Sequence, residues 1–138
     1  MKGFILVFGF VFSLISAVFA EDYRYVSKED MMAWLKQNRE MKVVDIQLKE
    51  DFDKKHIAAA IPTYAFPVKN EEQKKMVEKI LPELKSNNLP VLIVCPRGGS
   101  GAKNTYDYLK SQGVDESRLY ILKGGMSTWD YNEYTVLK

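Results

Sequence analysis

The sequence predicts an α/β fold with a mostly parallel central sheet and helices on both faces. Short runs rich in apolar and β-branched residues, typical of buried strands, lie at residues 41–46, 91–94 and 119–122. Segments with helical spacing separate these runs, as expected for strands joined by helical crossovers. The run 91–94 is apolar throughout, which indicates a central strand covered on both faces.

The first twenty residues predict a signal peptide. Lys2 is the only charge before Glu21, and an apolar run from residue 3 ends with small residues up to Ala20. This layout is typical of secretory signals, with cleavage after Ala20. The alternative is an uncleaved membrane anchor, because the run approaches the length that spans a bilayer. We expect an exported protein, periplasmic (or secreted where there is no outer membrane), without stable membrane association after cleavage.

Composition limits the partners that we expect. The net charge is +2 and the lysines are scattered, so nothing indicates a nucleic-acid-binding surface. No repeat or linker interrupts residues 21–138, which we predict to form one domain. A single histidine and a single cysteine cannot build a closed metal site, and we predict no metal and no cofactor.

In the first half of the chain, residues 23–26 are expected to form an edge strand or an extended lead-in. Ser27 then begins a helix with a sequence similar to a capping box, and this helix should end near residues 38–40. Residues 41–46 predict a strand with Asp45 at its end. One or two helical turns should follow at 50–55, and then an extended segment at 56–62.

In the second half, residues 70–86 have helical spacing that Pro82 must kink or restart. The strand 91–94 follows, and then a helix from about 100 to 112 that Gly113 ends. Residues 119–122 predict another strand, and 123–129 a glycine turn into a short helix. The tail, 130–138, shows no clear period.

The strand 91–94 leads directly into the only cysteine, Cys95. Three of the four residues at positions 98–101 are glycine, and a helix begins near Ser100. Such a loop can direct its N–H groups toward one point, and the positive end of the helix dipole adds to their effect. Arg97 or Lys103 could add a full charge. We therefore predict an anion-binding loop with a nucleophilic thiolate at its base.

Two chemistries suit a cysteine in such a loop, phosphoryl transfer and sulfur transfer. Cysteine phosphatases place an arginine at the sixth position after the cysteine, where it binds the phosphate through two hydrogen bonds. That position is Gly101 here, which argues against a phosphatase. A persulfide carries its negative charge on the outer sulfur, and the same N–H groups can hold it.

Three segments, in order, resemble the signatures of single-domain rhodanese sulfurtransferases. Residues 44–62 are similar to the signature that runs from Asp-Val-Arg to Gly-His-Ile-Pro-Gly-Ala. Residues 92–102 are similar to the active loop, in which glycine stands three places after cysteine. Residues 122–129 are similar to the closing Leu-x-Gly-Gly-x-x-x-Trp pattern. The resemblance covers roughly residues 25–129.

The resemblance implies that Cys95 takes a sulfane sulfur from a donor, thiosulfate or polysulfide, and passes it to a thiophilic acceptor. It implies the persulfide-binding backbone of Arg97, Gly98, Gly99, Ser100, Gly101 and Ala102. It also implies that Asp45 and His56 support the structure around the site. The partners would thus be small sulfur compounds.

The chain departs from the family pattern at several positions. Ser100 and Gly101 stand where many members have arginine and serine, and the loss of the arginine weakens the case for thiosulfate as the donor. Either Arg97 substitutes for it, or the donor is a neutral or larger persulfide or polysulfide. Gln47 replaces an arginine, and Ala58-Ala59 replaces a Pro-Gly pair. The alternative function is a non-catalytic sulfur carrier or interaction module with the same fold.

Overall fold

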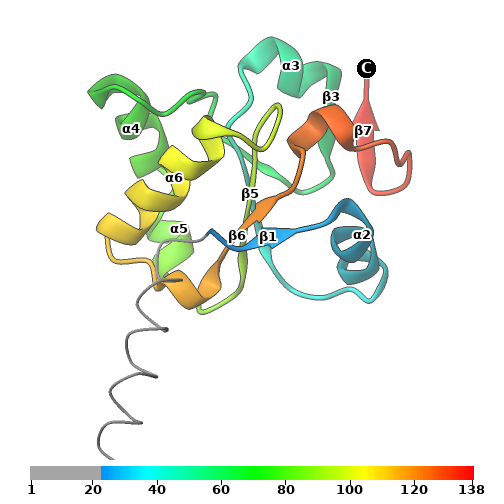
Figure 1. Ribbon diagram of the computed structural model, residues 1–138, viewed down its shortest axis with the longest axis horizontal. Helices are drawn as coiled ribbons and strands as arrows, with labels where there is room; N and C mark the ends of the chain where they lie inside the picture. Colours follow the sequence, from blue (N-terminus) through cyan, green and yellow to red (C-terminus); the bar gives the residue numbers. More distant parts are fainter. Residues whose placement is uncertain (1–22) are drawn as a thin grey trace, which may run out of the picture.

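The computed structural model describes residues 23–138, and the predicted signal segment lies outside them. The main sheet has five strands in the order β1-β6-β5-β2-β4, all parallel (Figure 1). These strands are Tyr25–Val26, Leu119–Leu122, Val91–Val94, Lys42–Asp45 and Ile61–Pro62, in that spatial order. The prediction of a mostly parallel sheet is therefore confirmed, with β5 at its centre.

Helices cover both faces of the sheet, as predicted (Figure 1). The described α-helices are α2 (Lys28–Lys36), α3 (Lys49–Lys54), α4 (Glu71–Glu78), α5 (Leu81–Lys85) and α6 (Ser100–Ser111). Two 3₁₀ turns, η1 (Glu116–Arg118) and η2 (Gly125–Thr128), flank β6. No helix within residues 23–138 has both the length and the apolar character needed to cross a membrane.

Strand β5 shows how one sequence run supplies two cores. Val91 and Ile93 belong to the core under α4, α5 and α6, whereas Leu92 and Val94 belong to the core that includes α2. Successive side chains of a strand point to opposite faces, so an entirely apolar run is required when both faces are covered. The second core also includes Trp129, whose side chain is almost fully buried.

The helix ends follow the expected local chemistry. The Ser27 side chain caps α2 by accepting a hydrogen bond from the Asp30 N–H at 3.0 Å. This helix ends at Lys36, before the expected 38–40, because the chain turns at Asn38 with a φ of 55°. Pro82 restarts the helix as predicted, since it lies in the first turn of α5, where its missing N–H costs nothing.

Two expectations for the remaining segments were incomplete. Residues 56–62 do not form one extended segment: β3 (Lys55–Ile57) and β4 are separated by a turn at Ala59, which has a φ of 70°. The tail contains β7 (Thr135–Leu137), which pairs antiparallel with β3. The Trp129 indole N–H donates to the Thr135 hydroxyl at 2.8 Å and holds the tail against the domain.

Candidate active site

Cys95 lies at the carboxyl end of the central strand, buried at the base of a loop that begins α6. The Gly98 N–H donates a hydrogen bond to the Cys95 sulfur, with an N···S distance of 2.8 Å. Gly98 has a φ of 72°, a conformation that other residues rarely adopt. The loop therefore folds back so that its backbone reaches the sulfur.

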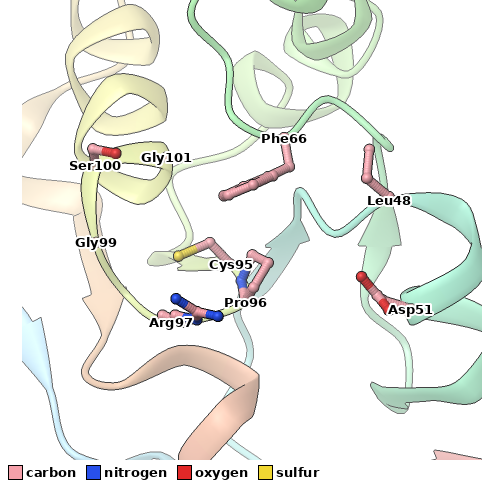
Figure 2. A pocket seen from close by; sticks show the side chains of 9 residues that line it. All are labelled: Leu48, Asp51, Phe66, Cys95, Pro96, Arg97, Gly99, Ser100 and Gly101. Atoms are coloured by element: carbon pink, nitrogen blue, oxygen red, sulfur yellow. The ribbon is translucent and has the colours of Figure 1, made fainter.

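The helix α6 adds to the electrostatic field at this loop. Gly99 occupies its N-cap position and, having no side chain, offers no capping hydrogen bond. The first N–H groups of a helix have no partner within it and favour negative charge nearby. The end of α6 that carries these groups adjoins the cysteine loop (Figure 2).

The glycine turn after β6 packs directly against the cysteine loop. The Met126 N–H donates to the Cys95 carbonyl at 2.9 Å, and the Ser127 N–H donates to the Pro96 carbonyl at 2.8 Å. A Cβ atom on Gly125 would lie 2.1 Å from the Cys95 carbonyl oxygen. The two loops therefore meet at one edge of the sheet, and their contact is so close that it requires glycine.

A pocket of about 440 Å³ opens above the sulfur (Figure 2). Its lining includes five of the predicted site residues, Cys95, Arg97, Gly99, Ser100 and Gly101, together with Leu48, Asp51, Phe66 and Pro96. Gly98 instead packs against the turn at Gly124 while its N–H contacts the sulfur. Ala102 is fully buried in the core, and Lys103 lies over the Tyr23 ring.

Four pocket residues are absent from the predicted site: Pro96 within the cysteine loop, and Leu48, Asp51 and Phe66 from other segments. Leu48 and Asp51 come from the start of α3, and Phe66 comes from the segment after β4. A Cβ atom on Gly101 would lie 2.9 Å from the Phe66 ring. Gly101 stands where many family members have serine. This loss of a side chain is the one feature of the sequence that indicates a bulky neighbour such as Phe66.

Asp45 lies at the end of β2, next to the strand that leads to Cys95, and the N–H of the following residue, Ile46, donates to the Val94 carbonyl at 2.9 Å. Its buried carboxylate accepts hydrogen bonds from the Gln47 backbone N–H at 2.8 Å and from the Gln47 side-chain amide at 2.9 Å. The same amide donates to the Lys55 carbonyl at 3.1 Å. Gln47 therefore links the strand end to β3 from the position where the family pattern has arginine.

His56 contributes to structure at some distance from the sulfur pocket. Its Nδ1 lies 2.6 Å from the Phe52 carbonyl oxygen, and its ring stacks on the Phe52 ring with centroids 3.8 Å apart. It does not line the pocket above Cys95. No group of three or more histidine, cysteine, aspartate or glutamate side chains within residues 23–138 is arranged to hold a metal ion.

A family model for the rhodanese-like domain matches residues 27–132. The chain belongs to the rhodanese-like family. A comparison with curated protein sequences finds no match.

Solved rhodanese-like structures share the fold at low sequence identity. A rhodanese-like domain protein from Staphylococcus aureus is 22% identical, with a TM-score of 0.59 over 83% of this chain and 98% of that one. A Saccharomyces cerevisiae homologue of single-domain rhodanese and the Cdc25 phosphatase catalytic domain is 18% identical, with a TM-score of 0.63 over 78% and 79%. The As-Sb reductase of Leishmania major is 20% identical, with a TM-score of 0.59 over 78% and 77%. These likenesses show the fold and leave the reaction open.

The contact at Gly125 predicts a large cost for a small substitution. Gly125→Ala should lower the free energy of unfolding by at least about 3 kcal/mol, because the new methyl group meets the Cys95 carbonyl and φ is 57°. Gly99→Ala is the matched control, since nothing lies within 4 Å of its Cβ position. Denaturant unfolding would measure both, and equal effects would contradict the proposed contact.

Asp45 predicts a pH dependence of stability. Burial raises the pKa of the Asp45 carboxyl to about 6, although the hydrogen bonds from Gln47 act to lower it. The folded state therefore binds more protons than the unfolded state between about pH 4 and pH 6, and stability falls as pH rises through this range. The change attributable to Asp45 is up to about 3 kcal/mol. Asp45→Asn should remove this part of the slope, and an unchanged slope would contradict the assignment.

Proposed function

We propose that the protein is an exported sulfurtransferase that moves a sulfane sulfur through a persulfide on Cys95. The observation that carries the proposal is the hydrogen bond from the Gly98 N–H to the cysteine sulfur at the base of an open pocket. A backbone donor already directed at sulfur favours the anionic thiolate, which is the form that attacks a sulfur donor. The neighbouring helix N-terminus favours the same charge.

In the proposed first step, the Cys95 thiolate attacks the outer sulfur of the donor. With thiosulfate, a new S–S bond forms on Cys95, the S–S bond of the donor breaks, and sulfite leaves with the bonding electron pair. In the second step, a thiophilic acceptor attacks the outer sulfur and releases the thiolate; cyanide becomes thiocyanate. Each step exchanges one bond for another, so neither needs an oxidant, a metal or a cofactor.

The protein supports these steps mainly through its backbone. The turn at Gly124-Gly125 fixes the Cys95 and Pro96 carbonyls, so the loop is held in place before a donor binds. Preorganised N–H groups stabilise charge without the cost of ordering them during the reaction. Arg97 lines the pocket beside the cysteine and adds a positive charge (Figure 2).

The proposed site of action is outside the cytoplasm, in the periplasm or in the surrounding medium. The support is the sequence pattern of residues 1–20, which the structure does not describe. A single cysteine cannot form an internal disulfide there, so Cys95 remains available for sulfur chemistry. Its partners would be a small sulfur donor and a thiophilic acceptor, without nucleic acid and without stable membrane association after signal cleavage.

Intact mass measurement tests the proposal. The reduced protein, incubated with thiosulfate or polysulfide, should gain the mass of one sulfur atom, and cyanide should remove it. Cys95→Ala should gain nothing while it unfolds in a cooperative transition like that of the wild type. If the reduced wild-type protein gains no sulfur from either donor, the proposed sulfurtransferase activity is refuted.

A turnover assay with the same donors separates a sulfur carrier from an enzyme. An enzyme should produce thiocyanate over many turnovers when donor and cyanide are both in excess. A sulfur carrier should form the adduct once and release it only to a specific acceptor. An aryl phosphate serves as the control for phosphatase chemistry, and we expect no hydrolysis because Gly101 stands in place of the phosphate-binding arginine.

A further inference from the structure

The wall of the pocket opposite the cysteine loop carries two large apolar side chains beside the carboxylate of Asp51. The Phe66 ring lies over the pocket, and Leu48 lines it from the start of α3 (Figure 2). A Cβ atom on Gly101 would lie 2.9 Å from both Cδ1 and Cε1 of the ring. The ring therefore approaches the first turn of α6 as closely as a glycine permits.

The segment that carries Phe66 is held in a specific conformation. Tyr64 and Val68 both have a φ of 58°, which is unusual for a β-branched residue such as Val68. The Phe66 N–H donates to the Ile46 carbonyl at 2.9 Å, and the Asn104 side chain donates to the Pro67 carbonyl at 3.1 Å. Such backbone strain persists only where surrounding contacts impose it. These contacts thus fix the backbone that carries the Phe66 side chain beside the sulfur pocket.

The charges of the lining do not favour a doubly charged ion. Its nine residues include one cation, Arg97, and one carboxylate, Asp51, so their formal charges cancel. An inorganic dianion would lose hydration here without an excess of positive charge to replace it. The volume, about 440 Å³, falls in the range of about 300–1,000 Å³ that is usual for small organic ligands.

We propose that Phe66 selects organic sulfane donors that carry an aromatic or other apolar group, in preference to inorganic thiosulfate. This inference rests on the sulfur transfer proposed for Cys95. An organic thiosulfonate, R–SO₂–S⁻, shows the chemistry. The Cys95 thiolate bonds to its outer sulfur, the S–S bond of the donor breaks, and the sulfinate R–SO₂⁻ leaves with the electron pair. The group R contacts Phe66 and Leu48 while the outer sulfur reaches Cys95.

Two matched donors isolate the contribution of the ring. Benzenethiosulfonate and methanethiosulfonate present the same outer sulfur and the same charge, and they differ in the group R. The second-order rate of sulfur loading on Cys95 is measured for each by quenched intact mass, with thiosulfate as a third donor. The wild type should load fastest from benzenethiosulfonate.

The decisive quantity is the ratio of two loading rates, the rate with benzenethiosulfonate divided by the rate with methanethiosulfonate. Phe66→Ala should lower this ratio about tenfold, the size of an aromatic contact near 1.4 kcal/mol. The intrinsic reactivities of the donors cancel when the ratios of variant and wild type are compared. A substitution that only disturbed the fold would slow all three donors in proportion and leave the ratio unchanged.

Further variants protect the test from misfolding. Phe66→Leu keeps apolar bulk without the ring, and should lower the ratio by a smaller factor. Leu48→Ser removes the second apolar wall at a position 48% exposed to solvent. Serine is also favoured there, because Leu48 is the N-cap of α3 and makes no capping hydrogen bond. Leu48→Ser should therefore fold normally and lower the ratio too.

The outcomes distinguish the two proposals. If the variants load sulfur with the ratio of the wild type, the selectivity of Phe66 is refuted and sulfur transfer stands. If the wild type loads fastest from thiosulfate, the preference for organic donors is refuted in the same way. If the wild type loads from polysulfide but from none of these three donors, the preference for organic donors is refuted and sulfur transfer stands. If polysulfide fails as well, sulfur transfer itself fails, and the selectivity fails with it.

Discussion

The site depends on the close contact between two backbone turns, the cysteine loop after β5 and the glycine turn after β6. The Cα of Gly125 lies so near the Cys95 carbonyl that no side chain fits between them, and two N–H groups of η2 bond to this loop. Because β5 and β6 are neighbouring parallel strands, both loops emerge at the same edge of the sheet. The contact therefore fixes the sulfur and the donor N–H of Gly98 relative to the whole domain.

The fold was largely predictable because its elements carry local signals. The apolar run of β5, the cap at Ser27 and the restart at Pro82 each follow from the residues present. The β3–β7 pair was missed because its strands are three residues long and gain their order from distant partners. The hydrogen bond from Trp129 to Thr135 holds the tail in place, and no periodicity within the tail reveals it.

Only the part of the candidate site that is formed by the cysteine loop could be predicted from the sequence. Cysteine and glycine have chemical and conformational properties that can be recognised in a sequence, and their loop lies where predicted. The opposite wall comes from Leu48 and Phe66, in segments without a clear pattern, and only tertiary packing brings them to the sulfur. The role of Gln47 was likewise hidden, because its amide links Asp45 to the Lys55 carbonyl only after the strands assemble.

The central claim is that the backbone of the cysteine loop holds an anionic persulfide. A crystal structure of the sulfur-loaded protein tests it most directly. The account predicts added electron density for one sulfur atom on Cys95, with this atom inside the pocket and within hydrogen-bond distance of backbone N–H groups between Gly98 and Ala102. An outer sulfur that points away from the loop, with no backbone N–H in reach, would contradict the account.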